Sequence, residues 1–191
     1  MKPPIVLDAC GLRITFQRQA DRFAHQIALV EHGKLVPLLA SIEGDADQIF
    51  PPSPPFQHLE RDIARDGSRV VLLTGIAGRA HWSASVKLSR AAPHVSFDVA
   101  ARIHAPPERL GSTYRFAQPP NVSLATQSCE QVPLYSNWRL IASANDAQAP
   151  SQITTSGSLC SIQPAPLPTA PWPRTIRWSY TMVGASARHR F

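Results

Sequence analysis

The side chains best suited to chemistry occur in two neighbouring segments, with His81, Ser83 and Ser85 in the first and Asp98 and Arg102 in the second. An imidazole, a carboxylate, a guanidinium and hydroxyl groups can hydrogen-bond a polar or anionic ligand such as a sugar. Within each segment these residues are an even number of positions apart, so a β-strand would place them on one face. We therefore predict a ligand-binding sheet face, and the alternative is a solvated face with cross-strand ion pairs.

The same residue types could also carry out proton transfer. His81 and Asp98 could act as acid and base in an enzyme of sugar or ester chemistry. Ser83 has the type of a nucleophile, but no Gly-x-Ser-x-Gly turn exposes it, and residues two apart on a strand lie side by side. The sequence therefore favours a non-catalytic binding domain, with the enzyme as an alternative.

The alternation in these two segments predicts how they pair. Residues 81–88 and 95–103 each place apolar side chains, such as Trp82 and Phe97, on the face opposite the polar residues. In an antiparallel pair, opposed residues share a face and their residue numbers sum to a constant. Because the apolar positions are even-numbered in the first segment and odd-numbered in the second, this sum must be odd. A sum of 183 sets Val86 opposite Phe97, and a sum of 181 keeps the same faces. We predict a hairpin in one of these two registers.

Other alternating or apolar runs predict the remaining strands. These runs are residues 12–17, 23–29, 35–42, 69–74, 113–116, 122–124, 132–134, 138–142, 159–162 and 175–183. Residues 69–74 are apolar throughout, which predicts burial on both faces, and residues 159–162 are predicted as an edge strand. Pro37 predicts an edge position or a bulge. Between residues 58 and 65, Leu59 and Ile63 are four apart, which predicts two turns of helix.

Proline governs the rest of the architecture, because 19 prolines against 9 glycines disfavour long helices. Clusters at residues 51–55 and 163–173 predict extended straps, and Trp172 is either a ligand platform or a strap anchor. We predict an all-β antiparallel β-sandwich of roughly eight to eleven strands with at most one short helix. Residues 1–183 would form one domain, and residues 184–191 a flexible basic tail.

Charge is unevenly distributed along the chain, whose formal net charge is +6. Residues 109–191 carry seven basic and two acidic side chains, whereas the preceding residues are nearly balanced. The arginines are dispersed and no nucleic-acid-binding motif accompanies them, which argues against a nucleic-acid ligand. A structural or assembly protein that contacts an acidic partner is a further alternative.

Cysteine usage and hydropathy predict the environment. Cys10, Cys129 and Cys160 are far apart and form neither a metal-binding pair nor a disulfide framework. The histidines show no metal-ligand spacing, so neither a metal nor a cofactor is expected. The first residues lack a signal-peptide pattern, and no apolar run approaches the ~20 residues that span a bilayer. These features predict a cytoplasmic protein without membrane contact.

The strand pattern of residues 69–103, with one polar face, resembles the long paired strands of antiparallel sandwiches in carbohydrate-processing proteins. The resemblance covers this segment, includes no shared motif, and implies a fold without assigning a residue. Taken with the polar face, it leads us to expect a carbohydrate or another polar or anionic molecule as the ligand.

Overall fold

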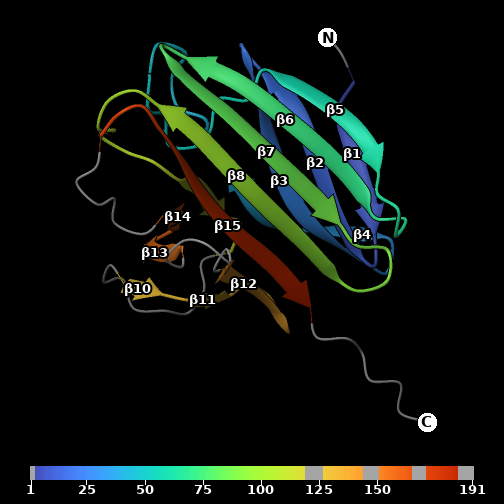
Figure 1. Cartoon of the computed structure of the whole chain (residues 1–191). Coiled ribbons are helices and arrows are strands. Elements are labelled where there is room, and N and C mark those ends of the chain that lie inside the picture. The colour runs from blue at the N-terminus through green and yellow to red at the C-terminus, as the bar shows by residue number, and fades with distance from the viewer. Residues whose placement is uncertain (1–2, 119–126, 144–150, 165–170, 185–191) are drawn as a thin grey trace.

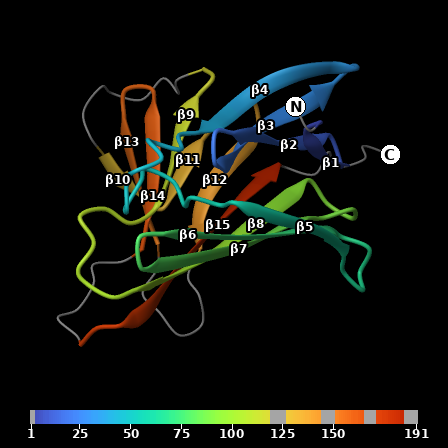
Figure 2. The same cartoon turned by 90° about the horizontal axis from the view of Figure 1, so that it is seen from above.

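Two antiparallel β-sheets pack against each other in the computed structural model (Figures 1 and 2). The structure describes residues 3–118, 127–143, 151–164 and 171–184. One sheet has eight strands in the order β1-β2-β3-β4-β9-β14-β13-β10, and the other has seven in the order β11-β12-β15-β8-β7-β6-β5. These described residues contain no helix. The predicted all-β antiparallel sandwich is therefore confirmed.

The chain forms runs of two to four consecutive strands in one sheet before it crosses to the other, and β15 is the single last strand. The eight-stranded sheet contains β1 (Ile5–Ala9), β2 (Leu12–Gln19), β3 (Arg22–Glu31), β4 (Lys34–Ser41), β9 (Ser112–Phe116), β10 (Gln127–Cys129), β13 (Gln152–Ser156) and β14 (Leu159–Gln163). The seven-stranded sheet contains β5 (His58–Ile63), β6 (Arg69–Ala77), β7 (Ala80–Leu88), β8 (His94–Ile103), β11 (Gln131–Pro133), β12 (Trp138–Ser143) and β15 (Arg174–Gly184). The number of strands exceeds the prediction because several short strands lack a clear alternation.

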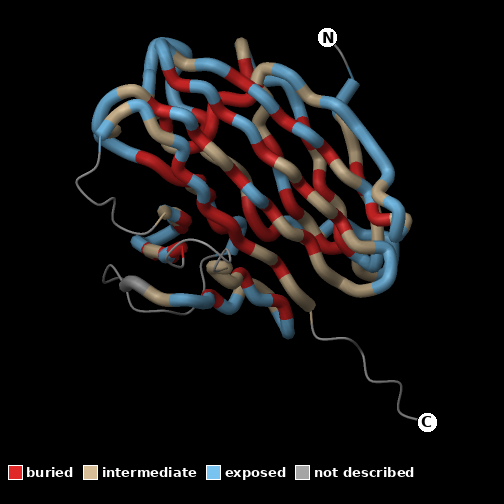
Figure 3. Tube along the Cα trace, in the orientation of Figure 1, coloured by how far each residue is buried: buried red, intermediate tan, exposed pale blue. Residues whose placement is uncertain are grey.

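The central hairpin has the register with the larger of the two predicted sums. Val86 lies opposite Phe97, and His81 lies opposite Arg102. Trp82 and Phe97 are each only 2% exposed, so the apolar face points into the core as predicted. β15 pairs with β8 along its whole length. Figure 3 shows the resulting alternation of buried and exposed residues along these strands.

β6 differs from its prediction in two respects. Leu72 and Ile76 are 44% and 50% exposed, so only one face of this strand is buried. The strand also continues beyond the predicted end at residue 74, through Gly75 to Ala77. A Cβ atom on Gly75 would lie 2.0 Å from the carbonyl oxygen of Pro55. The glycine is therefore required by the close approach of the first proline-rich strap.

The predicted helix over residues 58–65 is wrong, because this segment forms the edge strand β5, which pairs with β6. A spacing of four fits both one face of a helix and one face of a strand, so Leu59 and Ile63 could not discriminate. The edge position predicted for residues 159–162 is also wrong, since β14 lies between β9 and β13. The bulge predicted at Pro37 is present between β3 and β4.

The first proline-rich strap crosses from the eight-stranded sheet to the seven-stranded sheet. Phe56 anchors it in the core, and the amide of Phe23 donates a 2.7 Å hydrogen bond to the carbonyl oxygen of Phe56. The second strap is described only at its ends, and the strand predicted at residues 122–124 and most of the predicted tail lie outside the described residues.

The cysteines and the helix content complete the description of the fold. Cys10, Cys129 and Cys160 are free thiols, of which Cys160 is buried. Within the described ranges there is no helix long and apolar enough to cross a membrane.

Candidate functional site

The residues predicted for binding lie together on the outer face of the seven-stranded sheet. His81, Ser83, Asp98 and Arg102 are exposed, and Ser85 is half-buried. The register sets Ser85 opposite Asp98 and His81 opposite Arg102 on the neighbouring strand. The structure therefore brings these five residues onto one rigid surface.

Trp172, the sixth residue predicted for binding, does not lie on this surface. Its side chain is half-buried and packs against the hydrophobic core. The guanidinium carbon of Arg174 lies 5.9 Å from the centroid of its ring, a distance typical of a cation–π contact. Of the two roles that the sequence left open, the strap anchor agrees with these contacts.

The exposure of His81 and Asp98 bears on the catalytic alternative. The enzyme alternative predicts a concave pocket that excludes water around these two side chains. Both side chains instead face solvent at the sheet surface. This surface offers hydrogen-bonding groups for a ligand, and His81 and Asp98 are both exposed on it.

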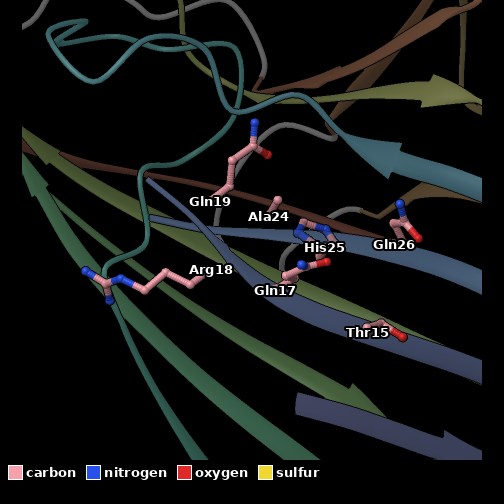
Figure 4. Close-up of a pocket in the computed structure, with 7 residues that line it drawn as sticks. All are labelled: Thr15, Gln17, Arg18, Gln19, Ala24, His25 and Gln26. Carbon is pink, nitrogen blue, oxygen red and sulfur yellow. The ribbon is translucent and has the colours of Figure 1, made fainter. Parts of the chain in front are cut away.

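A pocket of about 240 Å³ lies over strands β2 and β3 (Figure 4). It is lined by Thr15, Gln17, Arg18 and Gln19 from β2 or its end and by Ala24, His25 and Gln26 from β3. None of these residues belongs to the set predicted from the sequence to bind a ligand. The pocket nevertheless results from the same alternation of inward and outward side chains along a strand that predicted the polar face of β7 and β8.

The pairing of β2 with β3 explains the hollow. Thr15 lies opposite Gln26, and Gln17 lies opposite Ala24, so these four side chains share one face. The inward positions between them include Phe16, which is buried in the core. Because the methyl group of Ala24 is short, it leaves space between the longer amide side chains. A run of Thr and Gln at alternate positions opposite a small residue is the signal that could have indicated this pocket.

The lining includes one charged residue, Arg18, whose guanidinium is held by backbone groups at one end of the pocket. The guanidinium of Arg18 donates hydrogen bonds of 3.3 Å to the carbonyl oxygens of Asp21 and Gln57. Its central carbon lies 5.8 Å from the ring centroid of Phe23, and Figure 4 shows the side chain directed away from Gln26. The outward-facing polar lining apart from Arg18 is neutral and consists of amides and a hydroxyl.

Behind the pocket, the side chain of His25 enters a buried polar chain. His25 Nε2 lies 2.8 Å from the hydroxyl of Tyr114, which lies 2.5 Å from the hydroxyl of Tyr180. Burial lowers the pKa of His25 to about 4, because desolvation disfavours the imidazolium. His25 is therefore neutral at neutral pH, and it connects the pocket floor to the core.

A buried carboxyl group extends this polar chain. The hydroxyl of Ser41 lies within hydrogen-bond distance of the carboxyl group of Glu43 and 3.1 Å from the carbonyl oxygen of His25, and its single proton can be donated to one of these acceptors at a time. Burial raises the pKa of Glu43 to about 7, although the Ser41 hydrogen bond and the charge of Arg22 oppose the rise. These groups support the strand ends beneath the pocket.

Neither surface has the composition of a metal centre. In the part of the chain that the structure describes, no group of three or more His, Cys, Asp or Glu residues is arranged to hold a metal ion. The chemistry available at the pocket is hydrogen bonding by neutral amides, and at the opposite sheet face it is hydrogen bonding and charge.

Comparisons with known proteins do not indicate a function for this chain. No protein-family model matches the chain, and a search of curated proteins also finds no match. The functional conclusion therefore depends on the geometry and chemistry of these surfaces.

Proposed function

We propose that the chain is a non-catalytic binding domain for a carbohydrate or a similar polar ligand, and that the pocket over β2 and β3 is its binding site. The observation that carries this proposal is a hollow of about 240 Å³ whose lining is mostly neutral and polar, with Arg18 as its one charged residue. Each glutamine amide both donates and accepts hydrogen bonds, which matches the hydroxyl groups of a sugar.

The backbone supports this role because the lining residues lie on two paired strands. Groups held by a sheet are pre-organised, so a ligand does not have to order a loop when it binds. The pocket is smaller than the roughly 300–1,000 Å³ of sites for drug-sized molecules. It therefore suits a single sugar unit or one end of a chain better than a long oligosaccharide.

The outer face with His81, Asp98 and Arg102 is the competing surface. Its exposed cation and carboxylate favour a charged or extended polar ligand over a single neutral sugar. The outward positions of β7 and β8 contain no aromatic side chain other than His81 and His94, so stacking on a sugar ring would depend on imidazole. The pocket over β2 and β3 also has no aromatic lining residue other than His25, so its enclosed shape and the charges of the outer face decide between the two surfaces.

A glycan array with the purified protein, followed by calorimetric titration of the best ligand, tests the proposal. Gln17→Ala with Gln26→Ala should weaken binding by at least about tenfold, since each lost hydrogen bond contributes about 1 kcal/mol. The matched control is His81→Ala with Asp98→Ala, which should leave the affinity unchanged. The reverse result would place the site on the seven-stranded sheet, and no binding to any glycan would contradict a carbohydrate ligand.

A further inference from the structure

A second groove lies where the edges of the two sheets approach each other. β1 is an edge strand of the eight-stranded sheet and β5 is an edge strand of the seven-stranded sheet. Figure 1 shows the two strands close together, and Figure 2 shows the same edge from above. The groove between them has a volume of about 360 Å³ and is separate from the pocket over β2 and β3.

One wall of this groove is cationic. Arg61 comes from β5, Arg69 from the start of β6, and Arg90 from the connection between β7 and β8. The turn between β5 and β6 brings these segments together, because Gly67 adopts a positive φ of 76° there. A Cβ atom on Gly67 would lie 3.9 Å from Cδ of Arg90, so this arginine lies across the turn.

Two of the three nearby carboxylates are paired with cations outside the groove. Asp8 accepts two hydrogen bonds of 2.7 Å from Arg13, and Asp66 accepts one of 2.7 Å from Lys87. Asp62 also lines the groove, but its Oδ1 accepts a 2.7 Å hydrogen bond from the backbone amide of the following residue.

The three arginines, in contrast, keep their donors available. All three are exposed, and within the described ranges no ion pair or side-chain hydrogen bond involves the guanidinium of Arg61, Arg69 or Arg90. The groove therefore holds three guanidinium groups against the single carboxylate of Asp62. Counting charges along the sequence does not reveal this excess, because the first part of the chain is nearly balanced.

Apolar side chains complete the groove, with Ile63 on the same sheet as the arginines and Val6 and Leu7 on β1 across from them. Ile63 lies opposite Arg69 in the sheet and is 71% exposed, the largest exposure among the large hydrophobic residues of the described chain. Val6 is half-buried, and Leu7 is buried and belongs to the core. A hydrocarbon chain placed against these residues would cover apolar surface that is now in water.

We propose that this groove binds an amphiphilic anion, specifically a carboxylate attached to a single alkyl chain. A guanidinium matches a carboxylate through two parallel hydrogen bonds, and the neighbouring arginines add favourable charge. The alkyl chain lies along Val6, Leu7 and Ile63. This ligand class differs from the neutral polar ligand of the other pocket, so neither proposal depends on the other.

Nuclear magnetic resonance titration of the ¹⁵N-labelled full chain with decanoate, below the concentration at which it forms micelles, tests this proposal. Saturable shifts are expected at the amides of Leu7 and Ile63. The double variant Arg61→Gln with Arg69→Gln should weaken binding by at least about tenfold. The matched control is Arg139→Gln with Arg177→Gln, which removes the same charge from exposed strand positions and should bind as the parent protein does.

Two further probes separate the contributions of the head and the chain. Decan-1-ol and inorganic phosphate should each bind at least about tenfold more weakly than decanoate, because each lacks one half of the recognition. Equal binding of decanol would overturn the role of the arginines, and equal binding of phosphate would overturn the role of the alkyl chain. The proposal also fails if the control variant weakens binding as much as the groove variant, or if decanoate does not bind. In that last case the arginines would serve to protect the edge of β5 from pairing with another strand.

Discussion

The two faces of the central hairpin are made by neighbouring residues and yet have opposite environments. On the inner face, Phe97 stacks on Tyr180 with ring centroids 4.7 Å apart, and Trp82 lies edge-to-face with Trp178 at 6.2 Å. On the outer face, Asp98 is exposed to solvent. The comparison shows how a strand separates two tasks, since the inner residues stabilise the sandwich and the outer residues are free to contact a ligand.

The largest effect should come from removing an inner aromatic ring. Phe97→Ala leaves a cavity between Tyr180 and the ring of His25, whose centroid lies 5.7 Å from that of Phe97. We expect a loss of about 4 kcal/mol in the free energy of unfolding, measured with urea. Ser96→Ala on the outer face is the control and should change it by less than about 0.5 kcal/mol. An equal loss of unfolding free energy in the two variants would contradict the different roles assigned to the two faces.

The interior of the sandwich, into which the inner face of the hairpin points, also contains two ionisable groups from the eight-stranded sheet side. These groups should make the free energy of unfolding depend on pH. The pKa of Glu43 is raised to about 7 from 4.5, so its contribution is complete below pH 4.5 and is lost as the pH rises to 7. The pKa of His25 is lowered to about 4 from 6.5, so its contribution is complete above pH 6.5 and is lost as the pH falls to 4. Each shift corresponds to about 3 kcal/mol, and the two effects oppose each other between pH 4.5 and 6.5.

Glu43→Gln separates these two effects because it removes the titration of the carboxyl group. The free energy of unfolding of this variant should rise with pH between 4.5 and 6.5 more steeply than that of the parent protein. Urea unfolding at several pH values measures the difference. Glu60→Gln, at an exposed position of β5, is the matched control and should leave the profile unchanged. Identical profiles for all three proteins would contradict the role given to Glu43.

A smaller difference should separate the two inner tryptophans. The indole N–H of Trp178 donates a 3.0 Å hydrogen bond to the hydroxyl of Ser112, whereas that of Trp82 has no acceptor among the residues that the structure describes. Trp178→Phe should therefore cost about 1 kcal/mol more than Trp82→Phe. Thermal and urea unfolding of the two variants measure this difference. A greater cost for Trp82→Phe would show that packing dominates over the hydrogen bond.

The inner and outer faces could be predicted from the sequence because alternation is a local property. Trp82 and Phe97 each occupy alternate positions with the other apolar residues of their strands. This alternation determined which face they share and limited the register of the hairpin to two choices. The remaining choice depended on the turn between the strands. The exposure of Leu72 was not predictable in this way, since an apolar run has no parity to interpret.

The two cavities could not be predicted, because each depends on residues brought together across strands or sheets. The pocket over β2 and β3 depends on Ala24 being short at the position opposite Gln17. The groove between β1 and β5 includes one strand that the sequence pattern did not predict, β1, and one that it predicted as a helix, β5. It also includes Arg90, which comes from the connection between β7 and β8. Contacts between sheet edges leave no periodic signal in the sequence.

The smallest effect on stability should come from the outer face itself. His81→Ala with Asp98→Ala should change the free energy of unfolding by less than about 0.5 kcal/mol, because both side chains are exposed. The matched inner change, Val99→Ala, deletes buried methyl groups one residue away and should cost about 2 kcal/mol. A cost above about 1 kcal/mol for the outer pair would mean that cross-strand charges help hold the sheet together, as in an ordinary solvated face. A negligible cost leaves these residues available for binding.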